Sequence, residues 1–108
     1  PAANAFAEGF KAWLKEDSAR LTDNSNSEEI SAVTACGYDA YMAIYYALEK
    51  AQSLDGATLR DALAALDVPG LVTGDLKFDE NGDAVKSYAI IKTATTEGFV
   101  FADSVAIE

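Results

Sequence analysis

All of the helical periodicity in this sequence lies before residue 67, and the β-type alternation lies after residue 70. Apolar residues recur three or four positions apart over 2–15, 32–52 and 57–66, which predicts three amphipathic helices. The remainder predicts about three short strands. Read alone, helices followed by strands are typical of an α+β fold. Because three strands are too few to cover three helices, we expect the chain to be a fragment of a larger α/β fold.

The polar stretch 17–31 separates the first two predicted helices, and its Asp, Asn and Ser residues predict an exposed connection. Ser31 is the predicted N-cap of the second helix, because its hydroxyl can accept a hydrogen bond from an otherwise unpaired amide. One face of this helix carries a stripe of small or apolar residues, namely Cys36, Ala40, Ala43 or Ile44, Ala47 and Ala51. Such a stripe favours close packing against a sheet or another helix.

Asp55 is the predicted cap of the third helix. Val68-Pro69-Gly70 is predicted to end that helix, because proline cannot continue the helical hydrogen bonds and glycine permits a turn. The polar segment 79–83 predicts a turn in which Asn81-Gly82 suits positive φ angles. The predicted strands lie within 71–79, 87–93 and 99–101.

The charge balance excludes several classes of partner. The chain has 8 Lys or Arg residues against 18 Asp or Glu residues, for a net charge of −10. Such a surface repels phosphate backbones and anionic membranes, so we expect no nucleic-acid partner. The chain contains no His, which removes the commonest general base and the commonest zinc ligand. We therefore expect no enzymatic activity and no cofactor. No apolar run is long enough to span a bilayer.

Two further features are candidate sites. The acidic segment 79–83 resembles the start of a calcium-binding loop, but its glycine falls one residue early and position 12 would be Ile90 instead of Glu. We interpret this segment as a polar turn and expect no metal site. Cys36, the single cysteine, lacks a His partner and cannot form an internal disulfide. Its place on the apolar stripe predicts a buried structural thiol.

The tyrosines of the second predicted helix lie mostly off its small-residue stripe. A tyrosine ring usually packs against its neighbours while the hydroxyl stays hydrated, which is the structural interpretation of this set. Tyr38 differs by position, because it lies in the first two turns, near the helix end that favours negative charge. Its hydroxyl could help to hold a small anionic or zwitterionic ligand.

The segment Gly37-Tyr38-Asp39-Ala40, with the alanine-rich helix that ends in Ala47-Leu48-Glu49-Lys50-Ala51, resembles the substrate-binding proteins of branched-chain amino acid ABC transporters. These are type I periplasmic binding proteins of the leucine/isoleucine/valine-binding family. Residues 59–63 are similar to the next family helix, and residues 72–83 to the family's G-V-T-G-x-I-x-F-D-E-N-G-D stretch. Residues 6–14 are similar to the helix that precedes the polar loop. The resemblance covers essentially the whole chain, in order.

The resemblance implies two α/β lobes joined by three crossing segments, with the ligand in the cleft between them, and this chain resembles the C-terminal portion. Residues 1–86 would then belong to the N-terminal lobe. Residues 87–108 would cross the hinge and form a β-rich tail of the C-terminal lobe. Tyr38 is the one ligand contact that the resemblance carries over. The loop 19–29 and Val33 depart from the family pattern near the cleft and leave the ligand's identity open.

The function implied by the resemblance is that of the extracellular solute-binding component of an ABC importer, which binds an amino acid or a similar small polar ligand. A membrane permease would be its partner. The location would be periplasmic, or extracellular and lipid-anchored in a cell without a periplasm. One alternative is a ligand-sensing domain of a receptor or regulator on the same fold, and another is a stand-alone interaction domain.

If the chain is a fragment, we expect effects on its start, its ligand binding and its oligomeric state. The sequence starts at Pro1 without an initiator Met, so we expect processing or truncation to have removed the natural start. Because most of the ligand-binding residues would lie outside this chain, we expect the fragment alone not to bind ligand. Because its helices would lack the sheet that they normally cover, we expect it to form a homodimer.

Overall fold

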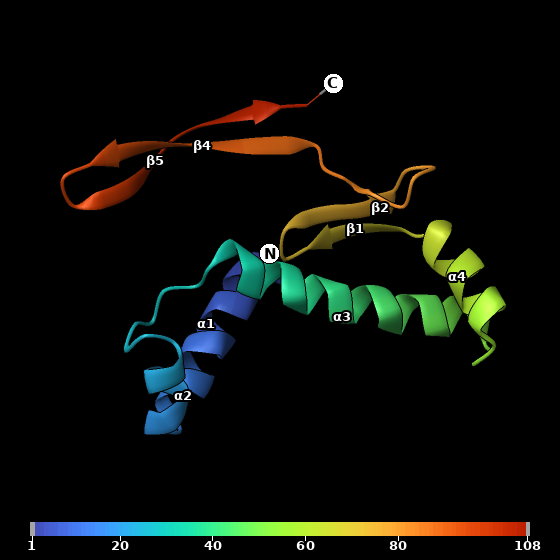
Figure 1. The fold of residues 1–108 in the computed structure, drawn as a ribbon, viewed down its shortest axis with the longest axis horizontal. Coiled ribbons are helices and arrows are strands. Elements are labelled where there is room, and N and C mark those ends of the chain that lie inside the picture. Colours follow the sequence, from blue (N-terminus) through green and yellow to red (C-terminus); the bar gives the residue numbers. More distant parts are fainter. Residues whose placement is uncertain (1, 108) are drawn as a thin grey trace.

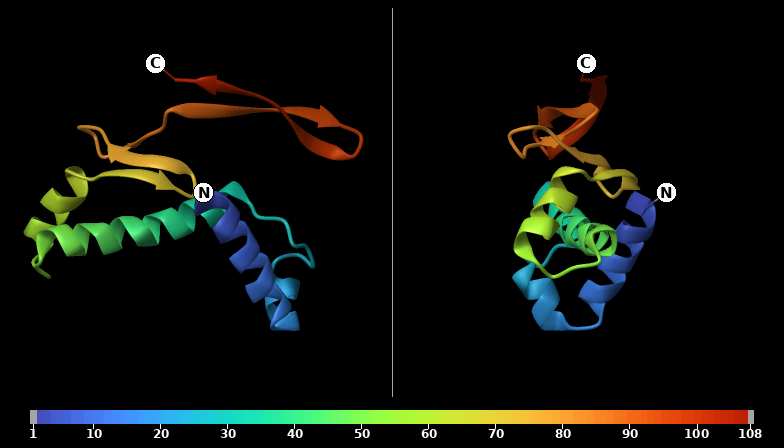
Figure 2. Two further views of the ribbon diagram at one scale, coloured as in Figure 1. Left: turned by 180° about the vertical axis from the view of Figure 1, so that it is seen from behind. Right: turned by 90° about the vertical axis from the view of Figure 1, so that its right-hand side faces the viewer.

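The computed structural model describes residues 2–107, in which four helices are followed by five strands (Figure 1). The helix α3 is the longest element; α1 and α2 lie at one of its ends and α4 at the other (Figures 1 and 2). The strands form two separate antiparallel sheets, of order β1-β2-β3 and β4-β5. The fold is therefore mixed α/β, as predicted, with one more helix and two more strands than the sequence indicated.

The first helix, α1 (Ala2–Lys15), has the predicted bounds. The following polar stretch is not wholly irregular, because it contains the short helix α2 (Ser18–Asp23). Asp17 caps α2 by accepting a 2.8 Å hydrogen bond from the backbone amide of Ala19. The Arg20 guanidinium lies 4.6 Å from the ring centroid of Trp13 and donates a 2.9 Å hydrogen bond to its carbonyl. These contacts hold α2 against α1 without any apolar stripe.

The long helix α3 (Ala32–Ala51) begins at its predicted cap, where Ser31 Oγ accepts a 3.1 Å hydrogen bond from the amide of Thr34. The small-residue stripe is buried only in its second half. There Ala43 and Ala47 form the core together with residues of α4 and of the first sheet, namely Ala62, Leu66 and Leu76. The first half of the stripe is uncovered, and Cys36 is exposed. The prediction of a buried thiol was wrong, because the neighbouring elements cover only the second half of this face.

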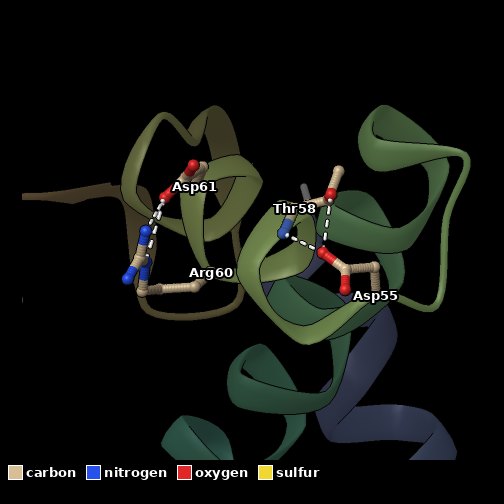
Figure 3. A network of polar contacts seen from close by, with 4 residues as sticks. All are labelled: Asp55, Thr58, Arg60 and Asp61. Atoms are coloured by element: carbon tan, nitrogen blue, oxygen red, sulfur yellow. Dashed lines mark hydrogen bonds and ion pairs between the residues drawn. The ribbon is translucent and has the colours of Figure 1, made fainter.

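The helix α4 (Gly56–Ala64) is capped by Asp55, as predicted. One carboxylate oxygen of Asp55 accepts hydrogen bonds from the amide and the hydroxyl of Thr58, both 2.9 Å long (Figure 3). The predicted end of this helix was wrong. The helix stops at Ala64, and Val68-Pro69-Gly70 instead lies within β1 (Asp67–Leu71). Because β1 is an edge strand, the missing amide hydrogen of proline is tolerated there.

The strand β2 (Gly74–Phe78) pairs with both β1 and β3 (Ala84–Val85), and the β1–β2 hairpin lies along α3 (Figure 1). The predicted turn between β2 and β3 is confirmed. Asp79 accepts hydrogen bonds from the amides of Asn81 and Asp83, each 2.9 Å long. Of the Asn81-Gly82 pair, only Gly82 adopts a positive φ, of 86°.

The strands β4 (Tyr88–Thr95) and β5 (Gly98–Ala106) form a two-stranded ribbon that extends away from the helices (Figures 1 and 2). Every residue of the ribbon is exposed. Both strands run longer than the sequence predicted. The whole structure is correspondingly open, with a radius of gyration of 16.6 Å, whereas a compact chain of this length has about 13 Å. The uncovered surface therefore includes a sheet that no helix covers, in addition to the predicted uncovered helix surface on α3.

Candidate functional site

Tyr38 lies in the second turn of α3, as predicted, and 44% of its surface is exposed. Its ring centroid lies 4.9 Å from that of Phe6 on α1, with the two rings tilted by 47°. The ring therefore packs across the junction of α1 and α3, while part of it remains accessible. The structural and the functional interpretations of Tyr38 are compatible in this geometry.

An apolar groove opens beside Tyr38 and has a volume of about 680 Å³. Its wall on α1 is a row of aromatic residues, Phe6, Phe10 and Trp13, whose successive ring centroids lie 5.9 and 5.8 Å apart. Val72, from the turn between β1 and β2, also lines the groove. This groove presents ring faces and methyl groups and is suited to an apolar side chain.

The helical spacing of the aromatic residues predicted the apolar face of α1 but not its position beside Tyr38. The aromatic residues recur at helical spacing, and that pattern is equally typical of a face that packs on a core. What brings Phe6 to Tyr38 is the angle at which α1 meets α3, which depends on the conformation of the intervening loop. No pattern in the loop encodes that angle.

Asp39, next to Tyr38 on α3, is buried and tied to the β1–β2 turn. Its Oδ1 accepts a 3.0 Å hydrogen bond from the amide of Val72. Its Oδ2 accepts a 2.7 Å bond from the amide of Thr73 and a 2.6 Å bond from the Thr73 hydroxyl. Sequence analysis assigned Asp39 no role of its own, because a single carboxylate on a helix does not reveal a partner more than thirty residues away.

Lys86 completes this polar network from the far side of the turn. Its ammonium donates a 2.7 Å hydrogen bond to Thr73 Oγ1 and a 3.4 Å bond to the carbonyl of Asp75. A hollow of about 170 Å³ lies beside the network, and Cys36 and Ala40 line it together with apolar residues of β2. Because the polar groups at its rim already bond to one another, we interpret this hollow as uncovered packing surface and not as a ligand site.

The described residues hold no arrangement typical of catalysis or metal binding. Among residues 2–107, no three His, Cys, Asp or Glu side chains gather in a way that could hold a metal ion. The hydrogen bond from Thr58 lowers the pKa of the Asp55 carboxyl, and the one from the Asp83 amide lowers that of Asp79. Asp55 caps α4 and Asp79 serves the β2–β3 turn, and neither lines the groove, so the site's geometry supports binding by shape and apolar contact.

The comparisons with known proteins define the class of protein, which is a ligand-binding region. The family described as "Receptor family ligand binding region" matches residues 1–96, and the chain belongs to this family. No curated protein matches the chain significantly.

Among solved structures, the chain is similar to the leucine-binding protein LivK from Thermotoga maritima. The two share 26% sequence identity with a TM-score of 0.75, and the match covers 98% of this chain and 27% of LivK. The resemblance to branched-chain amino acid-binding proteins that the motifs indicated is confirmed, and so is the expectation that this chain has the fold of a fragment of a type I periplasmic binding protein. No helix in residues 2–107 is both long and apolar enough to cross a membrane.

Proposed function

We propose that the chain is a portion of a two-lobed solute-binding protein that delivers an amino acid or a similar small polar ligand to an ABC importer. The observation that carries this proposal is the match of nearly the whole chain to a quarter of a leucine-binding protein. The apolar groove beside Tyr38 supports it, because it could receive the side chain of such a ligand. Tyr38 then supplies a polar hydroxyl to the ligand, beside the apolar contacts of the groove.

The two-part organisation follows from the same proposal. Residues 1–86 would belong to the N-terminal lobe, and residues 87–108 would cross the hinge into the C-terminal lobe. The isolated β4–β5 ribbon is consistent with this division, because it begins directly after Lys86 and Ser87 and packs little against the helices. Ligand contacts made only in the closed state would then shift the hinge equilibrium toward closure.

The partner and the location belong to the proposal as well. A closed pair of lobes would present its surface to a membrane permease. The protein would then act in the periplasm, or outside the cell with a lipid anchor where no periplasm exists.

A ligand-sensing domain is the second candidate function. The observation that favours it is the matching family, which is described as the ligand-binding region of receptors. Both candidates share the fold and the groove, and they differ in what responds to closure. Reconstitution of the two-lobed protein with a permease in vesicles separates them, because ligand uptake into the vesicles requires the importer role.

A thermal-shift screen of the two-lobed protein tests the binding function itself. The screen compares amino acids, short peptides, urea-like amides and aromatic acids. We expect one class to raise the melting temperature in a saturable way, because a ligand that binds only the folded state stabilises it by mass action. A protein that none of these compounds stabilises would contradict the proposal.

A further inference from the structure

Asp39 is the one charged residue that the structure buries among residues 2–107, with 4% of its surface exposed. A buried carboxylate is costly unless hydrogen bonds replace its hydration. Here three donors from two consecutive residues, Val72 and Thr73, surround it at 2.6–3.0 Å. The carboxylate is therefore committed to one turn, and any change in its position moves that turn.

That turn forms a wall of the groove. Successive residues on a helix point about 100° apart, so Asp39 faces the β1–β2 turn while Tyr38 faces α1. Val72, whose amide donates a hydrogen bond to Asp39, lines the same groove as Tyr38. The spacing between Val72 and Tyr38 thus depends on the hydrogen bonds of Asp39.

The hydroxyl of Thr73 extends the hydrogen-bond network that holds the β1–β2 turn. It donates to Asp39 at 2.6 Å and accepts from the Lys86 ammonium at 2.7 Å. Lys86 lies directly before Ser87 and β4, so the network joins α3, the turn and the segment that leads into the ribbon. One hydroxyl therefore connects the buried carboxylate to the only cation within the network.

We propose that Asp39 is a positioning residue that sets the width of the groove through Val72, and with it the preference for the size of the ligand's side chain. This inference rests on the proposed ligand-binding function. Asp39 itself does not touch the ligand. Lys86 acts with it by donating a hydrogen bond to Thr73, a residue of the turn.

The test compares the dissociation constants of leucine and alanine in the two-lobed protein by calorimetry. Asp39→Asn keeps the shape of the side chain but turns one acceptor into an amide donor that faces a backbone amide. The matched control is Asp75→Asn, because Asp75 accepts a 2.8 Å hydrogen bond from the Gly70 amide within the same hairpin but does not bond to α3.

We expect Asp39→Asn to reduce the preference for leucine over alanine by about tenfold, the effect of leaving one buried donor unpaired. Asp75→Asn should leave that preference unchanged. A purely structural role would lower the folded fraction and leave the ratio of the two dissociation constants as it is, so the ratio separates positioning from stability.

Substitutions at Thr73 keep the proposal testable if Asp39→Asn does not fold. Thr73→Ser retains the hydroxyl and should keep the wild-type ratio, whereas Thr73→Val removes it and should shift the ratio in the same direction as Asp39→Asn. An unchanged ratio in the folded Asp39→Asn and Thr73→Val proteins overturns the positioning role and leaves the binding function standing. If the wild-type protein binds neither amino acid, the proposed leucine preference and the positioning role are overturned, and the thermal-shift screen decides the binding function separately.

Discussion

The side chain of Tyr38 is partly packed and partly accessible. Substitutions can separate the role of its ring from that of its hydroxyl. The ring packs on Phe6, whereas the hydroxyl is free to serve a ligand if the groove is the binding site. We predict that Tyr38→Ala weakens ligand binding by the two-lobed protein by about 1–3 kcal/mol, from the lost contact and the partner group left unpaired. Calorimetry measures the affinity, and circular dichroism checks that the fold is retained.

Tyr38→Phe is the matched control for this prediction, because it keeps the ring against Phe6 and removes only the hydroxyl. If both variants bind as tightly as the wild type, Tyr38 has a packing role alone. If only the alanine variant loses affinity, the ring and not the hydroxyl contacts the ligand.

Asp55 caps α4, and the hydrogen bonds from Thr58 lower its pKa. A carboxyl whose pKa is lowered by folding stabilises the folded state fully above its ordinary pKa, and this contribution is lost as the pH falls through the lowered value. We predict that the amides in the first turn of α4 lose protection from hydrogen exchange over that acidic range. In Asp55→Asn the loss should be smaller, because asparagine caps a helix without titrating. Identical pH profiles in the two proteins would contradict this account of the cap.

At the level of elements, the helices whose apolar residues recur at helical spacing were predictable from the sequence. The elements that depend on hydrogen bonds of single side chains were not. The bounds of α1 and the caps of α3 and α4 follow from periodicity and from side chains that bond to the nearby backbone. The short helix α2 has no apolar period and depends on the Asp17 cap and on Arg20. Such six-residue helices leave no pattern long enough to detect.

The two wrong predictions share a cause, which is that long-range packing decided the outcome. Cys36 lies on the predicted stripe, yet the elements that cover α3 do not reach it. Pro69 stops helices locally, but here the chain had already left the helix, and pairing with β2 placed it in an edge strand. The link between Asp39 and Thr73 escaped prediction for the same reason.

The β4–β5 ribbon contributes little to the stability of the remaining chain, because all of its residues are exposed. We predict that, at concentrations where both chains are monomeric, a chain ending at Lys86 unfolds with a free energy within about 0.5 kcal/mol of that of the 108-residue chain, as surface changes usually do. The Lys86 bond to Thr73 is kept in this variant. Urea denaturation followed by circular dichroism measures the difference, and a loss of several kcal/mol would mean that the ribbon packs on the helices in solution.

The open shape of the whole molecule leaves apolar side chains in water on several elements. Phe99, Phe101 and Tyr88 on the ribbon and Tyr41 on α3 are each about two-thirds exposed or more. The imbalance of helices and strands in the sequence predicted uncovered helix surface. It did not predict the free-standing ribbon, because a strand pattern does not reveal whether a partner sheet lies within the same chain.

We predict that the 108-residue chain self-associates. Both outer edges of the ribbon lack a strand partner among the described residues, and an unpaired edge is a template for another chain. Burial of apolar area contributes about 25 cal/mol per Å², whereas repulsion from the net charge of −10 is screened beyond about 8–10 Å at physiological salt. Sedimentation equilibrium at micromolar concentration should give twice the monomer mass. A single monomeric species would show that the chain covers these surfaces itself.

The central claim is that this chain forms one side of a ligand site that is completed by a second lobe. Parallel calorimetric titrations with leucine, isoleucine and valine test it most directly. We predict saturable heat for the two-lobed protein with at least one of the three, and none for the 108-residue chain, because the contacts of one side of the site cannot offset the cost of immobilising a small solute. Micromolar binding by the 108-residue chain alone, or no binding by the two-lobed protein, would contradict the claim.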